Sequence, residues 1–384
     1  MKISADWLNK PSTRLVMGSL VSRGYQAYFV GGCVRNALLN TEATDIDIAT
    51  SAHPKKVSEI MESAGLKALP TGIKHGTVTV VADRRNYEIT TLREDIETDG
   101  RRAKVKFSES ILKDAKRRDF SINAIYSEQD GTIVDPLDGI ADIFEKRIKF
   151  IGDPYARIKE DYLRILRFFR FLALFGKEDE THKIEIAALN DLKDGLDTVS
   201  AERKSDEILK LFTAPNLKYS IFLMEKANIS SKIFDAYDYE SLSNLKKFED
   251  RFDVAPCATR RLAAYTDDDL KSNLRFSNKL VKVHKVLREA AKSQKDAAEL
   301  SYRYNEKIAW DSILVRSSLN GTEPSEKVFS RIKLGSVSKF PVKSSDLTEY
   351  FSGPKLGEML AYLEQKWIES DFTLNKEKLL VSIR

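Results

Sequence analysis

Short segments rich in β-branched and aromatic residues, bounded by Gly, Asp or Asn, recur through the first 150 residues of the chain. Such runs predict β-strands, here over residues 27–30, 45–49, 76–81, 87–92 and 133–135. Apolar positions with the helical period predict helices between them, over residues 11–23, 33–40, 54–64 and 110–125. The N-terminal part is therefore predicted to form a small mixed sheet flanked by helices.

After about residue 150 the strand signals largely vanish, and helix-period patterns follow one another to the C-terminus. No repeat of roughly 20–50 residues is visible, which excludes a solenoid. The sequence thus predicts an α+β protein with a head at residues 1–150, a helical neck at 151–215, and a helical body and tail at 216–384.

The composition is that of a globular protein, with 42% hydrophobic and 32% charged residues. Only two cysteines are present, Cys33 and Cys257, which excludes a disulfide framework or a cysteine-built zinc site and favours reduced thiols. No apolar run approaches the roughly 20 residues that span a bilayer. The first ten residues include acidic Asp6 and have no apolar signal core. We therefore expect a cytoplasmic protein that does not engage a membrane.

Two aspartates one residue apart lie in the second predicted strand. Side chains two positions apart on a strand share a face, so Asp45 and Asp47 point one way while Ile46 and Ile48 point into the core. Two like charges side by side are costly without a cation between them, and oxygen ligands suit Mg²⁺. The pair predicts a site for two-metal phosphoryl or nucleotidyl transfer. An exposed acidic edge strand is the alternative.

A Gly-Gly turn precedes this pair, between the first predicted strand and the following helix. Glycines let backbone amides approach a phosphate closely, and a helix N-terminus attracts anions. Gly32 and Arg35 are therefore candidate phosphate-binding residues, Arg35 through its charged fork. Simple turn chemistry is the alternative for Gly-Gly alone.

The combination of Gly-Gly-x-x-Arg at residues 31–35 with Asp-x-Asp at 45–47 resembles the head of the polymerase-β-like nucleotidyltransferases. It is most similar to the class II tRNA nucleotidyltransferases (CCA-adding enzymes) and bacterial poly(A) polymerases, although this chain has Asn36 where the family continues with Asp. The resemblance implies two Mg²⁺ ions on the aspartate pair and a third acidic group on a neighbouring strand. Glu88 is the candidate for that group, with a solvated strand face as the alternative.

The polar residues 93–102 include Asp99-Gly100, a turn signal. In the resembling family this segment is a flexible loop, which is needed for the change from C to A addition. The loop is expected here as well, and its presence favours addition of the full CCA sequence or of A.

Residues 101–120 carry eight basic and three acidic residues, an excess of five that equals the net charge of the whole chain. A basic stripe beside an aspartate pair suits a polyanionic substrate, whereas a solvated helix face could carry the same charge. Residues 117–124 match the family motif Arg-Arg-Asp-x-x-x-Asn-Ala. The resemblance implies that Arg118 contacts the nucleotide phosphates, with Asp119 and Asn123 nearby on one helix face.

A helix is predicted over residues 160–171, because apolar side chains cover most of its circumference. Asp161, Arg164, Arg167 and Arg170 recur every three residues and form one polar stripe. Arginines in so apolar a helix must be paired or face a wet cleft, and structural Arg–Asp pairs are an alternative for Arg167 and Arg170. The resemblance implies that this helix recognises the incoming base, with Arg167 and Arg170 helping to hold the nucleotide.

Two side chains suffice to distinguish the bases in this interpretation. Asp161 accepts a hydrogen bond and Arg164 donates one, which matches the amino donor and the ring-nitrogen acceptor of cytosine and adenine. Guanine and uracil present a carbonyl and an N–H in those places. The cost of mispaired buried polar groups then excludes them.

The C-terminal region carries few clusters of catalytic type. Residues 340–342 and 353–357 resemble the family's tail, which clamps tRNA through backbone phosphates, and this resemblance implies Lys343 and Lys355 as RNA contacts. The match to Ser-x-Glu-Arg-x-x-x-Glu at residues 200–207 is interpreted as a mainly structural helix start.

Together these patterns predict a CCA-adding tRNA nucleotidyltransferase. Such an enzyme transfers CMP and AMP from CTP and ATP to the tRNA 3′ end, releases pyrophosphate and uses Mg²⁺ as cofactor. An A-adding enzyme or a poly(A) polymerase is the alternative within the superfamily. A non-catalytic RNA-binding relative is an alternative of another class, and the intact aspartate pair argues against it.

Overall fold

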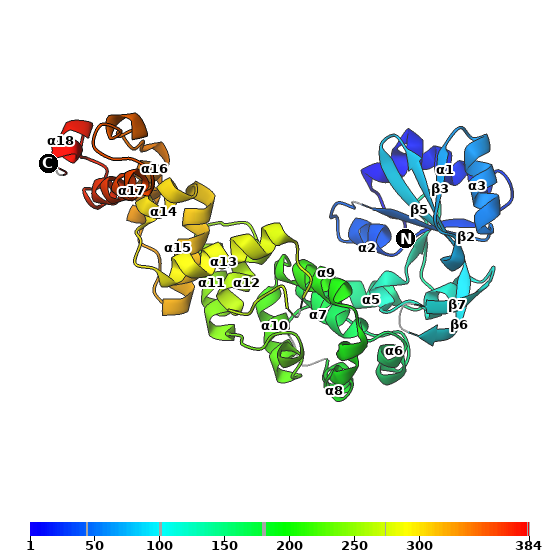
Figure 1. Ribbon diagram of the computed structural model, residues 1–384. Helices are drawn as coiled ribbons and strands as arrows, with labels where there is room; N and C mark the ends of the chain where they lie inside the picture. The colour runs from blue at the N-terminus through cyan, green and yellow to red at the C-terminus, as the bar shows by residue number, and fades with distance from the viewer. Residues whose placement is uncertain (44, 100–101, 179–181, 273, 382, 384) are drawn as a thin grey trace. The chain divides into compact units, whose positions relative to one another are not determined.

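The computed structural model describes residues 1–384 except 44, 100–101, 179–181, 273, 382 and 384 (Figure 1). The chain divides into two compact units. The first unit comprises Met1–Asp235 with Ser272–Arg275, and the second comprises Ala236–Lys271 with Phe276–Arg384. The candidate residues between Gly32 and Arg170 all lie in the first unit.

A mixed sheet forms the centre of the head, as the sequence predicts. Within the described residues its seven strands follow the order β3-β4-β5-β2-β1-β8-β9. The pair β2–β5 is parallel, and the other described pairs in this sheet are antiparallel. The strand bounds are β1 (Ala27–Val30), β2 (Ile46–Thr50), β3 (Lys67–Gly72), β4 (Thr77–Ala82), β5 (Arg85–Thr91), β8 (Tyr126–Ser127) and β9 (Ile133–Val134).

Helices α1 and α3 cover one face of this sheet (Figure 1). Tyr87 on β5 points to this face, because its hydroxyl hydrogen-bonds Ser12 and Thr13 of α1. Residues that alternate with Tyr87 and its partner Ile46 therefore point to the opposite face. The head helices are α1 (Pro11–Val21), α2 (Gly32–Leu38), α3 (Pro54–Ser63), α4 (Ile111–Lys116) and α5 (Gly139–Phe144).

The predicted loop at residues 93–102 is a β-hairpin in the structure. Strand β6 (Arg93–Asp99) pairs antiparallel with β7 (Arg102–Phe107) in a separate two-stranded sheet. The Gly100 half of the predicted turn lies outside the described residues. Oppositely charged residues face each other across the two strands, as Glu94 does with Lys106, and such pairs explain how so polar a segment forms a hairpin.

The helix predicted over residues 110–125 is wrong beyond Lys116. Ser110 caps helix α4, since its hydroxyl accepts a hydrogen bond from the Lys113 amide, and the helix ends after six residues at Lys116. Phe120 is fully buried and forms an isolated bridge with Phe150, which draws the chain out of the helix. Only a single 3₁₀ turn follows, at Ser121–Asn123.

The helix predicted over residues 160–171 is two helices. Helix α6 (Pro154–Glu160) ends before Asp161, whose backbone is extended with φ −157° and ψ 104°, and α7 (Arg164–Phe175) begins three residues later. Asp161 therefore stands in the break between the helices rather than on a common stripe. Helix α7 packs against α9 and α10. The remaining helices of this unit are α8 (Lys183–Asp191), α9 (Ala201–Phe212) and α10 (Leu217–Lys226).

The described regular elements of the second unit are all helices. Its helices are α11 (Tyr239–Arg251), α12 (Ala258–Tyr265), α13 (Asn278–Lys292), α14 (Ala297–Arg303), α15 (Glu306–Asn320), α16 (Lys327–Val337), α17 (Pro354–Glu369) and α18 (Lys376–Val381). None of the helices that the structure describes is both long and apolar enough to span a bilayer. The succession of a mixed-sheet head and helices confirms the predicted α+β architecture.

The short 3₁₀ helices complete the described elements. They are η1 (Asp6–Asn9), η2 (Ile73–His75), η3 (Ser121–Asn123), η4 (Lys193–Thr198), η5 (Ser230–Lys232) and η6 (Ser344–Asp346). Four of the α-helices, α1, α3, α6 and α17, begin with proline. The fixed φ of proline suits the first helical position, where no backbone N–H is needed.

Candidate active site

Two acidic side chains lie next to each other on the sheet face opposite α1, and a third acid lies directly before one of the two strands that carry them. In the parallel pairing of β2 and β5, Asp47 stands directly opposite Glu88. Asp45 lies directly before β2, which begins at Ile46 rather than at the predicted residue 45, and its negative charge reaches Asp47. The structure thus brings Asp45, Asp47 and Glu88 together, and Glu88 occupies the neighbouring-strand position expected for a third acidic group.

This arrangement disfavours the charge of Asp47. Burial raises its pKa from 3.8 to about 6, and the negative charges of Glu88 and Asp45 add to the shift. The nearby guanidinium of Arg118 opposes the shift but does not cancel it. A bound cation would relieve this repulsion.

The carboxylates fit a Mg²⁺ site that substrate completes. No group of three or more His, Cys, Asp or Glu side chains in the described part of the chain is close enough to hold a metal unaided. Mg²⁺ is commonly bound by one or two carboxylates together with substrate phosphates, rather than by an all-protein cage. Oxygen donors and the raised pKa of Asp47 suit this kind of site.

The Gly-Gly turn (Gly31–Gly32) lies between β1 and α2, close to Arg118. Gly31 has φ +72°, which a side chain would make unfavourable. A Cβ there would also stand 3.5 Å from Nη1 of Arg118. Gly32 is the first residue of α2, so its amide is among the N–H groups without a partner within the helix.

Cys33 follows the turn and is buried. Its Sγ donates to the backbone carbonyl of Val30 at 3.4 Å and lies 3.9 Å from that of Asp47. Burial raises the pKa of the thiol to about 12, and the negative charge of Asp47 acts in the same direction. Cys33 is therefore a packing residue rather than a nucleophile.

Arg35 connects the turn to helix α7. Its Nη1 donates to Oδ1 of Asn123 at 2.5 Å, and its guanidinium carbon lies 4.2 Å from the centre of the Phe175 ring. Burial, followed by the positive charge of Arg170, lowers the pKa of Arg35 to about 10. Asn36, the departure from the family pattern, accepts from Arg35 and donates to the carbonyl of Glu42.

Asp119 and Asn123 are joined by a hydrogen bond although they do not share a helix. The Asn123 amide donates to Oδ1 of Asp119 at 3.0 Å, and Arg167 Nε donates to Oδ2 at 2.7 Å. Burial alone would raise the pKa of Asp119, but Arg167 and Asn123 hold it well below its usual range. A continuous polar chain thus runs from Arg35 through Asn123 and Asp119 to Arg167.

Arg167 and Arg170 of α7 both form ion pairs, which agrees with the alternative of structural pairs. Even so, the positive charges in this part of the site outnumber the negative ones. Arg170 forms an ion pair with Glu207 at 2.6 Å, and Arg167 reaches the same carboxylate at 3.7 Å. Three guanidiniums, including Arg35, therefore face two carboxylates, those of Asp119 and Glu207. This leaves one positive charge for an anionic ligand.

Asp161 and Arg164 each have partners that fix their orientation. Arg203 donates to both oxygens of Asp161, at 3.2 and 2.7 Å. Arg164 Nη1 donates to Glu160 and to the carbonyl of Arg157, both at 2.6 Å. Oδ1 of Asp161 also accepts from the Leu163 amide at 3.1 Å, whereas Oδ2 accepts only from Arg203 among the described residues. The second lone pair of Oδ2 can therefore accept a hydrogen bond from a ligand.

Four positions of this site were missed by the sequence reasoning as site residues. They are Asp114, Arg157, Arg203 and Glu207, whose side chains bind the candidate residues or their backbone. Arg203 and Glu207 belong to the motif interpreted as structural. Asp114 was visible only as an acid within a basic stretch, which was the one available signal.

The candidate RNA contacts lie in the second unit. Lys343 and Lys355 are both exposed, Lys343 beside η6 and Lys355 in the first turn of α17. Each is free to approach a phosphate.

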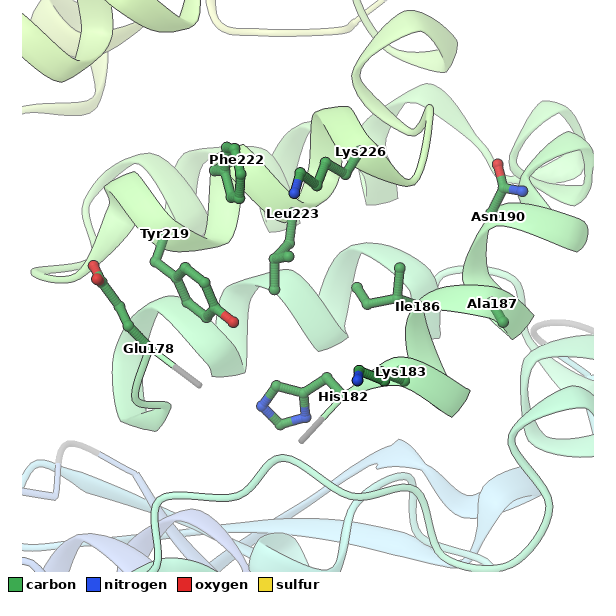
Figure 2. A pocket seen from close by; sticks show the side chains of 10 residues that line it. All are labelled: Glu178, His182, Lys183, Ile186, Ala187, Asn190, Tyr219, Phe222, Leu223 and Lys226. Carbon is green, nitrogen blue, oxygen red and sulfur yellow. The ribbon is translucent and has the colours of Figure 1, made fainter. Parts of the chain in front are cut away.

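A further cavity of about 680 Å³ lies between α8 and α10 (Figure 2). Tyr219 and Leu223 point into it from α10, and His182, Lys183 and Ile186 line it from the start of α8. None of the candidate catalytic or nucleotide-binding residues lines this cavity, so it is not assigned to the chemistry.

Comparison with known proteins shows the family. Residues 27–149 match the family model of the poly(A) polymerase head domain. CCA tRNA nucleotidyltransferase 1, mitochondrial, of Mus musculus is 31% identical over 378 residues, which cover 94% of this chain and 87% of that protein. The chain belongs to the CCA tRNA nucleotidyltransferases. The family resemblance stated from the head motifs is thereby confirmed, and the protein is an enzyme.

Other CCA tRNA nucleotidyltransferases support the assignment. The CCA-adding enzyme of Leuconostoc citreum is 41% identical over 231 residues, covering 60% of this chain and 56% of that protein. The crystal structure of the Bacillus stearothermophilus CCA-adding enzyme in complex with CTP has a TM-score of 0.70 and 26% identity. That likeness covers 94% of each chain.

Proposed function

We propose that this nucleotidyltransferase adds CMP and AMP, from CTP and ATP, to the 3′ end of tRNA and releases pyrophosphate. The observation that carries the proposal is the carboxylate group of Asp45, Asp47 and Glu88 beside Arg118 and the Gly-Gly turn. Support comes from the CTP complex of the Bacillus stearothermophilus relative. No protein nucleophile is required, because the RNA 3′-hydroxyl attacks the α-phosphate directly.

Enzymes of this family use divalent metal ions, and we assign Mg²⁺ to Asp45 and Asp47, with Glu88 beside them. When bound, Mg²⁺ supplies Lewis-acid activation of the 3′-hydroxyl and compensates charge on the leaving pyrophosphate. The protein's own part is to hold the nucleotide. We assign the phosphate oxygens of the nucleotide to the Gly32 amide and to the guanidiniums of Arg35 and Arg118.

Base selection is assigned to Asp161 and Arg164. Their side chains are 19% and 11% exposed, so a base that contacts them is largely removed from water. A mismatched carbonyl against Asp161 then leaves polar groups unpaired, which is the expensive outcome that rejects guanine and uracil. Arg167 and Arg170, with Asp119 and Asn123, complete the nucleotide site.

A cytoplasmic location is also proposed. Both cysteines, Cys33 and Cys257, are free thiols, which supports a reducing compartment. Microscopy of the tagged protein, compared with mitochondrial and cytoplasmic markers, tests this directly.

The first test is nucleotide addition with Mg²⁺ and one radiolabelled nucleoside triphosphate at a time. The acceptors are tRNA that lacks the whole CCA end, tRNA that lacks only the terminal A, and an unrelated RNA. Addition of C, C and A that then stops is expected. Incorporation of A only, onto the acceptor that lacks A, would instead show an A-adding enzyme. Long A tails on any RNA would show a poly(A) polymerase.

The carboxylates are tested by Asp45→Ala and Asp47→Ala. Each variant is expected to lose transfer by at least about a thousandfold while tRNA still binds, because the metal ligands act on the chemical step. Glu62→Ala, an exposed acid on α3, is the matched control and should keep full activity. Full activity in either aspartate variant would refute the metal assignment.

A further inference from the structure

Asp114 on α4 is a fully buried acid to which the proposed reaction gives no role. Its Oδ1 accepts from Arg117 Nε at 2.8 Å, and its Oδ2 accepts from Arg118 Nη2 at 3.0 Å and from the Tyr126 hydroxyl at 2.7 Å. The Arg93 amide at the start of β6 also points to Oδ1, at 3.4 Å. Every part of this carboxylate is therefore engaged.

The group stays ionised despite its burial. Burial would raise the pKa of Asp114, but the guanidiniums of Arg118 and Arg117 outweigh that effect and hold the pKa well below its usual range. The Tyr126 hydroxyl remains protonated, because burial raises its pKa above the ordinary range. The ionised Asp114 carboxylate thus accepts a hydrogen bond from the neutral Tyr126 hydroxyl, and both groups contact Arg118.

This pair immobilises one edge of the Arg118 guanidinium. Nε and Nη2 contact Asp114 at 3.3 and 3.0 Å, and Nε also lies 3.2 Å from the Tyr126 hydroxyl. Nη1 makes no hydrogen bond among the residues that the structure describes. The guanidinium therefore has one anchored edge and one available nitrogen.

The available nitrogen faces the phosphate-binding turn. Nη1 is the atom that a Cβ at Gly31 would meet at 3.5 Å, and the charge of Arg118 reaches Asp47. Tyr126 is in register with Val30, the residue directly before Gly31. The same strand pairing thus fixes the turn and the hydroxyl that holds Arg118.

We propose that Asp114 and Tyr126 are positioning residues that hold Arg118 with Nη1 turned toward the triphosphate of the incoming nucleotide. This inference rests on the proposed function, which places the triphosphate on the Gly-Gly turn. A cluster that only stabilised the fold would have no reason to leave Nη1 free at that turn. If Tyr126 positions Arg118, loss of its hydroxyl weakens nucleotide binding. If Tyr126 only stabilises the fold, the same loss lowers the Tm and leaves nucleotide binding unchanged.

The test compares two Tyr→Phe substitutions in the same sheet. Tyr126→Phe removes the hydroxyl that contacts Asp114 and Arg118. Tyr87→Phe is the matched control, because its buried hydroxyl also has two partners, Thr13 at 2.9 Å and Ser12 at 3.0 Å, on the opposite face. For Tyr126→Phe we expect the KM for CTP and ATP to rise roughly tenfold with kcat within about twofold. Tyr87→Phe should leave both unchanged at a similar loss of Tm.

A second comparison separates positioning from folding. If Tyr126 acts through Arg118, its substitution adds nothing to the KM of Arg118→Lys, whereas independent effects multiply. Calorimetric titration with CTP and Mg²⁺ gives the same comparison as a Kd. Equal CTP affinity in Tyr126→Phe and Tyr87→Phe, or multiplied effects in the double variant, would overturn the inference. Absence of transfer in the unmodified enzyme would overturn the proposed function alone, because the Kd comparison still tests Tyr126.

Discussion

The Asp47 carboxylate lies where its negative charge is poorly tolerated in the free protein. Burial disfavours its charge, and the negative charges of Glu88 across the strand pair and of Asp45 just before β2 repel it. Such a residue exchanges stability for function, since the same repulsion that destabilises the free protein favours cation binding.

The pH dependence of stability follows from this shift. The folded-state pKa of Asp47 is about 6, against 3.8 ordinarily. Between these values the folded protein binds more protons than the unfolded chain, so metal-free stability falls as the pH rises through this window. Above pH 6 the penalty is fully present.

We therefore expect Asp47→Asn to raise the metal-free stability at pH 8 by roughly 1–3 kcal/mol while it abolishes transfer. Thermal unfolding in EDTA measures the gain. Added Mg²⁺ should raise the Tm of the unmodified protein more than that of the variant. Glu62→Gln, on the exposed side of α3, should change neither the Tm in EDTA nor the rise in Tm that Mg²⁺ causes. A lower Tm for Asp47→Asn would show that the repulsion is not present.

At the scale of elements, local sequence patterns predicted the bounds of helices and strands that depend only on their own residues. They failed where a contact with a residue distant in the sequence ends a helix. The bounds of β1 match the strand predicted over residues 27–30, and β2 begins one residue later than the strand predicted over residues 45–49. The early end of α4 could not be predicted, because Phe120 leaves the helix to meet Phe150, thirty residues away. The break at Asp161 has a similar cause, since its carboxylate binds Arg203 on α9.

That ion pair has a consequence for base selection. Arg203 donates two hydrogen bonds to Asp161, a geometry that the single ammonium of lysine does not reproduce. Arg203→Lys should therefore let the Asp161 carboxylate turn, and discrimination between CTP and UTP should fall roughly tenfold.

The measurement is the ratio of kcat/KM for the two nucleotides. Arg275→Lys is the control. Arg275 pairs at 2.6 Å with Glu202, the neighbour of Arg203 on α9, but its side chain is 72% exposed and does not contact Asp161. Unchanged discrimination in Arg203→Lys would separate Asp161 from base selection.

At the scale of the whole molecule, the nucleotide site and the candidate tRNA contacts are in different compact units. The residue patterns predicted the head site, where several motifs converge, in more detail than the helical second unit. Binding to phosphates requires only exposed positive charge, which many lysines provide. For this reason the sequence could name Lys343 and Lys355 only through resemblance.

Phosphate contacts have a salt signature that can be measured. Lys343→Ala with Lys355→Ala should reduce tRNA affinity and lower the slope of log K against log salt by roughly 2, since about one counterion is released per contact. Addition to saturating tRNA should keep its kcat. Lys279→Ala with Lys282→Ala, two exposed lysines on α13, removes the same charge and should keep the slope. Equal slopes for the two double variants would dismiss these contacts.

The buried thiol of Cys33, beside the Gly-Gly turn, can be used to measure how often the head opens. Cys33 lies behind Asp47 with a pKa near 12, whereas Cys257 is partly exposed. A thiol-alkylating reagent should therefore modify Cys257 at once and reach Cys33 only during transient openings of the head, whose frequency sets the rate. Ligands that bind the closed head slow such openings by mass action. Mg²⁺ with CTP should thus protect Cys33 in proportion to occupancy, and labelling kinetics would follow the active site without any turnover.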